Sequence, residues 1–304
     1  MKKKSMKKRN VIILATIATV FLLQLLISNY GPQKIINVHE SIESKENVIQ
    51  LQDAMKKTGI SKIVLSGIPE DILYFDGTVQ SLADSKNNNA IIEQVIKEYP
   101  NQFDYICTID PNDVNRLELL ETCIQNGAVG VKLYNGYSYS HTAPIDDSVL
   151  NDFYAKIAEE NKILLLPVNT SEYTNELTNI LILNPTLKVI CPHYCLSSKN
   201  LPRLTELMDA HKNLYVDTSF GSLDLAIEGF DTITKNPEEF TAFFDQFADR
   251  ILFGTDNVIT TYENKDSEFI TSLYQTYLDV YKGLALPNSI TKKVFWQNWQ
   301  DLVK

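Results

Sequence analysis

The sequence lacks the glycine-rich phosphate loop of a dinucleotide-binding fold and contains only four histidines in 304 residues. Where that loop would follow the first predicted strand, the chain reads Asn37-Val38-His39-Glu40-Ser41, so a dinucleotide cofactor is disfavoured. There is also no low-complexity tract. With 44% hydrophobic and 22% charged residues, the composition is that of a folded protein with a substantial core, which excludes general disorder.

Positive charge is scarce outside the N-terminus. The net charge is −10, although residues 2–9 alone carry six basic side chains. Without those side chains the remainder carries about −16. Nucleic-acid phosphates repel such a body, and no basic stripe offsets the repulsion. We therefore expect no nucleic-acid partner.

Long hydrophobic runs are also absent, with one exception at residues 11–28. Within this run only Thr16, Thr19, Gln24 and Ser28 are not apolar, and a helix of this length spans about 27 Å, close to the thickness of a bilayer core. The basic residues before it predict a cytoplasmic tip at 1–10, a transmembrane signal anchor at 11–28 and an extracytoplasmic body at the cell membrane. A cleaved signal peptide is the alternative, but the run is longer than usual and no A-x-A-like site follows.

Cysteine is rare as well. The four cysteines, Cys107, Cys123, Cys191 and Cys195, would lie in a compartment that permits disulfides. Cys191 and Cys195 flank a predicted strand end, and four extended residues span about 13 Å, which exceeds the ~5.5 Å of a disulfide. Unless the chain bends there, this pair is predicted to be unbridged. All four are expected to act as small buried hydrophobic residues.

Short β-branched or apolar runs alternate with amphipathic segments from residue 34 onward. Eight strands are predicted at 35–39, 62–67, 103–109, 129–134, 163–168, 187–193, 214–219 and 251–254. Helical patterns with apolar residues three and four apart lie between them. Such alternation indicates parallel strands with right-handed crossovers. Eight units in one chain predict an α/β fold, a (β/α)₈ TIM barrel formed by a single domain at 34–304.

Three polar residues follow predicted strand ends, where barrel enzymes place their chemistry. His39 ends the first strand, His193 ends the sixth, and Asp256 follows the eighth. Inward-facing imidazole and carboxylate groups could hold a divalent ion and polarise a water molecule. A purely structural role for both histidines stays open.

The faces of the first strand follow from side-chain alternation. On an ideal strand Asn37, His39 and Ser41 share one face, and Glu40 points to the other. A local bulge could redirect Glu40.

Other polar residues are weaker candidates. Lys132 ends the fourth strand, where a substrate-facing or ion-paired role is favoured over a metal-bridging one. Asp217 either orients a ligand or forms hydrogen bonds inside the barrel. Asp110 is expected to cap a helix, and His141 and His211 are expected to face solvent.

The order of these segments resembles the amidohydrolase-related family that includes the aminocarboxymuconate-semialdehyde and aromatic-acid decarboxylases. The resemblance covers about residues 35–303 and depends on the order and spacing of several motifs. They are Asn37-Val38-His39-Glu40-Ser41, Tyr99-Pro100 with Asp110-Pro111, Gly127-Ala128-Val129-Gly130-Val131-Lys132, Pro192-His193, Asn213-Leu214-Tyr215-Val216-Asp217-Thr218-Ser219 and Phe253-Gly254-Thr255-Asp256.

The resemblance implies a metal-dependent active site. In the family an H-x-H pair on the first strand, a histidine on the fifth and an aspartate on the eighth bind the metal, and a histidine on the sixth assists catalysis. By this resemblance His39 and Asp256 are metal ligands, zinc is the expected ion, and His193 is catalytic. Lys132 would offer its charge to an anionic substrate.

The chain departs from that pattern in its ligand set. Ser41 stands where the second histidine belongs, and the fifth strand ends in Leu166-Pro167-Val168-Asn169 without any histidine. Asn37 replaces a frequent aspartate. Because a catalytic zinc usually needs three protein ligands, two hypotheses stay open. One is metal-assisted hydrolysis or non-oxidative decarboxylation of a small carboxylated or amide substrate; the other is a pseudoenzyme whose barrel mouth binds a ligand or a partner.

Overall fold

Short buried strands alternate with amphipathic helices along the chain, as the sequence predicts. The structure, a computed structural model, describes residues 34–69, 87–260 and 265–304. The strands are β1 (Ile35–Ile42), β2 (Ile60–Ser66), β3 (Phe103–Thr108), β4 (Gly130–Lys132), β5 (Ile163–Leu165), β6 (Lys188–Cys191), β7 (Leu214–Asp217), β8 (Ile251–Leu252) and β9 (Asn257–Ile259). The main helices are α2 (Asn47–Thr58), α4 (Asn89–Glu98), α5 (Arg116–Gln125), α6 (Asn151–Glu159), α7 (Thr174–Leu183), α9 (Leu201–Ala210), α10 (Leu223–Lys235), α11 (Pro237–Gln246), α12 (Ser267–Gly283) and α14 (Asn298–Leu302).

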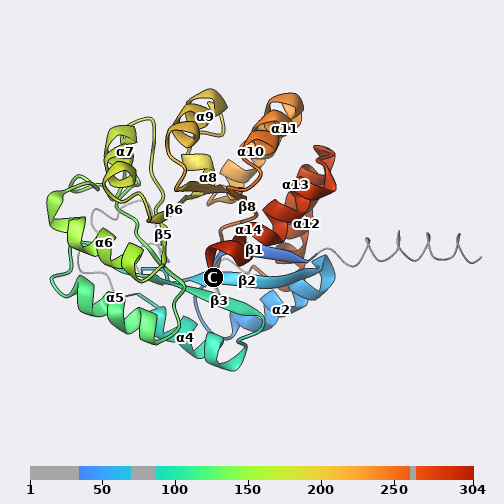
Figure 1. Ribbon diagram of the computed structural model, residues 1–304. Coiled ribbons are helices and arrows are strands. Elements are labelled where there is room, and N and C mark those ends of the chain that lie inside the picture. The colour runs from blue at the N-terminus through green and yellow to red at the C-terminus, as the bar shows by residue number, and fades with distance from the viewer. Residues whose placement is uncertain (1–33, 70–86, 261–264) are drawn as a thin grey trace, which may run out of the picture. The chain divides into compact units, whose positions relative to one another are not determined.

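The strands form one parallel sheet that closes into a barrel with the helices around it (Figure 1). The eighth strand of the barrel is divided: β8 pairs with β7, and β9 pairs with β1. Between these two pairings the backbone N–H of Val38 donates to Phe253 at 2.8 Å, and that of Asp256 donates to His39 at 2.7 Å. Residues 251–259 therefore close the barrel, and the predicted TIM-barrel architecture is confirmed.

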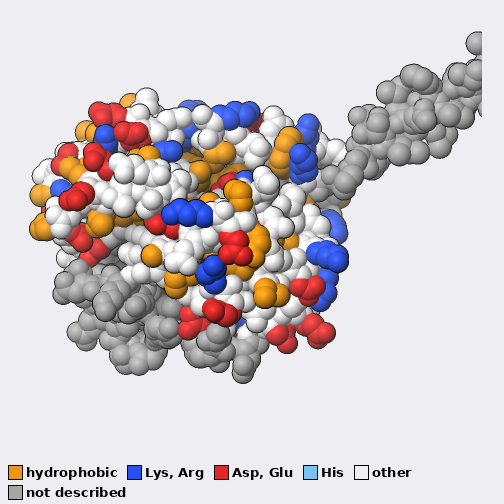
Figure 2. Space-filling model, turned by 90° about the horizontal axis from the view of Figure 1, so that it is seen from below, with side chains coloured by type: hydrophobic (Ala, Val, Ile, Leu, Met, Phe, Trp, Pro, Cys, Tyr) orange, Lys and Arg blue, Asp and Glu red, His pale blue; other side chains and the backbone are white. Residues whose placement is uncertain are grey.

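Two layers of apolar side chains support the sheet. The inner layer includes Ile36, Val64, Ile106 and Leu252, and α14 adds Trp299, whose indole N–H donates to Asp104 at 2.8 Å. Because Asp104 lies near the start of β3, Trp299 covers the amino-terminal end of the barrel. The outer layer packs the helices against the sheet. On the face shown in Figure 2, acidic and basic side chains are interspersed.

The predicted cytoplasmic tip (1–10) and signal anchor (11–28) lie outside the described residues. In the part of the chain that the structure describes, no helix has the length and apolar character needed to cross a bilayer. Residues 34–304 form one compact unit.

The prediction for the cysteines is wrong in one respect. All four are buried, as expected, but Cys107 is bonded to Cys123 and Cys191 to Cys195. The Cα atoms of Cys191 and Cys195 are only 5.0 Å apart, because the chain turns sharply after β6 instead of continuing as a strand.

The buried position of Trp299 gives a test of the packing. We expect Trp299→Ala to lower the free energy of unfolding by about 3–5 kcal/mol, since it empties a large volume under the barrel. The matched control is Trp296→Ala. Trp296 is half-buried and only partly packed on the same cluster, so this change should lower the free energy of unfolding much less. Urea unfolding curves of the two variants measure the difference, and equal losses would contradict this account of the core.

Candidate active site

His39 is the centre of a buried polar cluster at the carboxyl ends of the strands. Its Nδ1 lies 2.8 Å from Oδ2 of Asp217, which ends β7, and both side chains are fully buried. Burial alone would raise the pKa of Asp217, but the charge and hydrogen bond of His39 outweigh it, so the pKa falls below its usual range. Asp217 is therefore ionised at neutral pH and keeps a proton on Nδ1 of His39.

The other nitrogen of His39 faces two charged groups. Nε2 lies 2.9 Å from Nζ of Lys132 and 3.0 Å from Oδ1 of Asp256. When His39 is neutral, Nε2 accepts a hydrogen bond from the lysine; when it is protonated, it donates to the aspartate. Nε2 of His39 is thus in contact with both Lys132 and Asp256.

Lys132 ends β4 and is almost completely buried. Besides His39, its Nζ lies 3.5 Å from the hydroxyl of Ser66, 3.9 Å from Asp256 and 4.8 Å from the centre of the Tyr134 ring. Burial lowers the pKa of Lys132, while the nearby carboxylates of Asp256 and Asp217 oppose that shift. The sequence-based expectation that Lys132 is ion-paired agrees with this placement.

Asp256 lies between the two halves of the eighth strand in a left-handed conformation, with φ of 46°. Burial would raise its pKa, but His39, Lys132 and His193 outweigh that effect and the net pKa is lowered. Its second oxygen, Oδ2, is 3.4 Å from Nε2 of His193. The carboxylate therefore stands between both imidazoles and stays ionised.

His193 was expected at the end of a strand, but it lies in a left-handed turn. Its φ is 58°, and the next three residues also have positive φ, a conformation that costs about 1–2 kcal/mol per non-glycine residue. The backbone N–H of His193 donates to Oδ1 of Asp217 at 3.0 Å. Asp217 thereby holds His39 through the ring and His193 through the backbone.

Hydrogen bonds define which nitrogen of His193 is basic. Ser219 donates to Asp217, so its oxygen accepts from Nδ1 of His193 at 2.9 Å. Nε2 then accepts from the hydroxyl of Tyr137 at 2.8 Å. Burial lowers the pKa of His193, which leaves a neutral imidazole with its basic atom beside Asp256 at neutral pH.

Sequence reasoning missed Tyr137 and Ser219. Ser219 follows Asp217 by two residues, so strand alternation could have placed both on one face. Tyr137 lies in the loop after β4, where no periodicity fixes side-chain direction. Three tyrosines in six residues, at 134, 137 and 139, were the only signal for it.

The face prediction for β1 is wrong for Asn37. The pairing of β1 with β2 shifts register between Asn37 and Glu40. As a result the amide of Asn37 donates to Glu40 at 2.7 Å, while His39 and Ser41 point to the barrel interior. Glu40 lies behind Asp256, where Thr255 and the backbone N–H of Asn257, at 3.1 Å, donate to its carboxyl group.

Some weaker expectations also need correction. His141 is not solvent-facing, because it stacks on Tyr173 and lies 2.9 Å from Glu176. His211 ends α9, as expected, but is half-buried. Asp110 accepts from the backbone N–H of Asn112 at 2.9 Å and so caps the turn that precedes α5.

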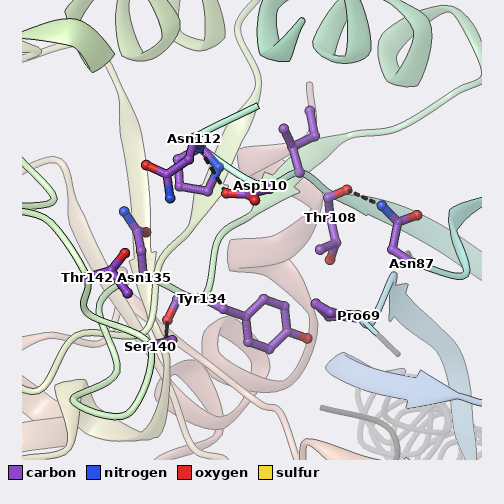
Figure 3. A pocket seen from close by; sticks show the side chains of 11 residues that line it. Pro69, Asn87, Thr108, Asp110, Asn112, Tyr134, Asn135, Ser140 and Thr142 are labelled. Atoms are coloured by element: carbon purple, nitrogen blue, oxygen red, sulfur yellow. Dashed lines mark hydrogen bonds between the residues drawn. The ribbon is translucent and has the colours of Figure 1, made fainter. Parts of the chain in front are cut away.

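A cavity of about 770 Å³ opens above the polar cluster. Lys132, His193 and Asp256 lie in its lining, and most of the remaining wall is apolar or aromatic. That wall includes Ile68, Tyr134, Tyr137, Tyr139, Phe220, Leu223, Phe269, Leu273 and Tyr277. A second cavity, of about 30 Å³, lies between Asp110, Asn135 and Tyr134 (Figure 3). It is large enough only for a water molecule, so the larger cavity is the candidate substrate site.

A divalent ion does not fit this arrangement of side chains. It would need the lone pair of His39 Nε2, which Nζ of Lys132 already contacts at 2.9 Å. Ser41 lies 3.1 Å from the hydroxyl of Ser66, and a hydroxyl is a weak zinc ligand. Within residues 34–69, 87–260 and 265–304, no three His, Cys, Asp or Glu side chains are arranged to hold an ion. Bound metal would require Lys132 to withdraw.

A family model described as Amidohydrolase matches residues 72–301. The chain belongs to the amidohydrolase family. This confirms the resemblance read from the sequence motifs. A comparison with curated protein sequences finds no match.

Solved structures of amidohydrolase-like proteins share the fold. A probable 2-pyrone-4,6-dicarboxylic acid hydrolase from Acinetobacter baumannii has a TM-score of 0.64 at 16% identity over 88% of this chain and 98% of that one. An amidohydrolase from Burkholderia multivorans with bound zinc has a TM-score of 0.62 at 9% identity over 88% and 98%. 5-Carboxyvanillate decarboxylase from Sphingomonas paucimobilis has a TM-score of 0.55 at 12% identity over 89% and 99%. At these identities the likeness shows the fold alone.

The buried Glu40 predicts a pH-dependent stability in this amidohydrolase. Burial raises its pKa to about 8, against the opposing hydrogen bonds from Thr255 and Asn37. The folded state therefore holds a proton that the unfolded chain releases above its ordinary pKa of 4.5. Stability from this group is complete below pH 4.5 and is lost as the pH rises to about 8, by an amount on the order of 5 kcal/mol.

We expect Glu40→Gln to remove this slope, because the amide stays neutral at every pH. Urea unfolding at pH 5, 7 and 9 measures it against the wild type. The exposed Glu121→Gln is the control and should keep the wild-type slope. Parallel stability curves for Glu40→Gln and the wild type would refute the assignment.

Proposed function

We propose that this amidohydrolase hydrolyses, or decarboxylates without an oxidant, a small carboxylated or amide substrate in the 770 Å³ cavity. One observation carries the proposal: His39, His193, Asp256 and Lys132, from four different strand ends, converge within hydrogen-bond or ion-pair distance at one rim of the barrel. Such convergence of titratable groups in a largely apolar cavity is typical of an active site.

Each residue has a role that follows from its contacts. Lys132 binds the anionic group of the substrate, since it is the lysine of the cavity lining that is buried beside His39 and Asp256. His193 transfers the proton through Nε2, the atom that Tyr137 and Asp256 flank. For hydrolysis, it takes a proton from the attacking water and passes it to the leaving group. For decarboxylation, Nε2 first takes a proton from a water molecule and then donates it to the carbon from which carbon dioxide departs, while the hydroxide leaves with the carbon dioxide as bicarbonate.

The proteins with similar folds support a carboxylated substrate. The names of two of them, a 2-pyrone-4,6-dicarboxylic acid hydrolase and 5-carboxyvanillate decarboxylase, refer to carboxylated compounds. A buried lysine in an aromatic cavity suits the same chemistry.

We also propose that residues 11–28 anchor the chain in the cell membrane, with the barrel outside the cytoplasm.

The incomplete ligand set favours a second candidate function. Ser41 and the fifth strand supply no histidine, and a site that has lost metal ligands suits a protein that binds the carboxylated ligand without converting it. Turnover separates the two candidates, whereas binding alone does not.

Catalysis is tested with a panel of small lactones, amides and aromatic carboxylic acids, with product or carbon dioxide detected by mass spectrometry. We expect His193→Asn to lower turnover by about 10²–10⁴-fold, the range for loss of a general acid or base. Lys132→Met should mainly weaken binding. Lys188→Met, at the start of β6 on the opposite end of the barrel, is the control. Tight binding with no turnover of any substrate would establish the second candidate instead.

Zinc, the ion that the resemblance implies, gives a separate test. After exchange into metal-free buffer and reloading, elemental analysis should find well below one zinc per wild-type chain, because Lys132 occupies the lone-pair side of His39. Lys132→Ala should increase the uptake. One tightly held zinc in the wild type, lost in His39→Ala, would instead assign His39 and Asp256 as ligands.

A further inference from the structure

The turn that carries His193 is closed by a disulfide. Cys191 ends β6, and Cys195 lies two residues after His193, with Cα atoms 5.0 Å apart. The bond therefore encloses the candidate proton-transfer residue within a loop of five residues.

The backbone of this loop is unusual. Cys191 is extended, but His193, Tyr194, Cys195 and Leu196 follow with φ of 58°, 53°, 51° and 53°. None of them is glycine, and left-handed stretches of L-residues persist only where the surrounding structure enforces them. Contacts with the surrounding structure must therefore stabilise this turn.

Backbone hydrogen bonds lie within the turn: the N–H of Leu196 donates to His193 and that of Ser197 to Tyr194, each at 2.9 Å. Two further bonds come from outside it. Asp217 accepts from the backbone N–H of His193 at 3.0 Å, and Thr170 donates to the carbonyl of Cys195 at 2.8 Å. An extended chain would place residues 191 and 195 about 13 Å apart. The disulfide is the covalent link between the two ends of this span.

We propose that the Cys191–Cys195 disulfide is a positioning element for His193: it enforces the left-handed turn that directs the imidazole between Asp256 and Tyr137. The role of His193 in turnover rests on the proposed function, but its position does not. Both cysteines are completely buried, so the bond acts as a permanent brace and not as a sensor of external thiols.

The second disulfide provides a matched comparison. Cys107–Cys123 joins β3 to α5 and belongs to the outer layer between the sheet and the helices. No hydrogen bond or ion pair of His193 involves it: the partners of His193 are Tyr137, Ser219, Asp217 and Asp256. Removing it should lower stability without moving His193.

The experiment compares three double variants of the full chain: Cys191→Ala with Cys195→Ala, Cys191→Ala with Cys195→Gly, and Cys107→Ala with Cys123→Ala. Labelling of His193 by diethylpyrocarbonate, measured by peptide mass spectrometry, reports whether the imidazole stays buried. His39 in the same molecule is the internal reference. Turnover of the panel above is measured in parallel.

We expect His193 to be labelled about tenfold faster in the first variant than in the wild type. One left-handed residue that is no longer held costs about 1–2 kcal/mol, which shifts the equilibrium between the closed and the open turn by about that factor. His39 should label as before. The glycine variant, which also lacks the bond, should label more slowly than the first, because glycine accepts positive φ at position 195. It also keeps the test informative if the first variant fails to fold.

Unchanged His193 labelling in both variants would overturn the proposal, and so would an equal increase at His39 or in the Cys107–Cys123 variant. If labelling changes as expected while no variant, including the wild type, converts any substrate, the positioning role stands and the proposed enzyme activity fails.

Discussion

The carboxylate of Asp217 is the interaction on which the rest of the site depends. One oxygen holds Nδ1 of His39, and the other accepts from the backbone N–H groups of His193 and Ser219, each at 3.0 Å. A buried carboxylate with this many donors stays ionised and rigid. Because the strands bearing His39 and His193 lie on different sides of the barrel, a single side chain fixes the relative position of both imidazoles.

Much of the fold was readable from periodicity alone. Eight apolar runs separated by amphipathic segments allow few arrangements other than a parallel barrel, and parallel strands bring the carboxyl ends to one rim. The sequence therefore predicts His39, His193 and Asp256 at one rim, with Lys132 at the end of the fourth strand. Deviations from ideal backbone could not be foreseen: the bulge that turns Asn37 away and the left-handed turn that joins Cys191 to Cys195 both depend on tertiary contacts. Tyr137 was not predicted as a site residue because it lies in a loop, where side-chain direction follows no periodic pattern.

Charge balance explains why the ligand set differs from the pattern of the family. Asp217 and Asp256 bring two buried negative charges, and buried charges need a compensating partner. In a metal-binding barrel an ion supplies that compensation. Here Nζ of Lys132 lies beside the same imidazole nitrogen, at 2.9 Å, and 3.9 Å from Asp256. Ser41 faces Ser66 instead of an ion, so the hydroxyl suits the lysine-containing site.

The position of Trp299 has a kinetic consequence. In the described part of the chain, Trp299 belongs to a layer of buried side chains inside the barrel, and this packed layer lies beneath the cavity that Lys132 lines. Reactant and product must then use the same entrance in turn. A released acid that lingers near the lysine would exclude the next molecule, so departure of the product competes directly with the arrival of fresh reactant.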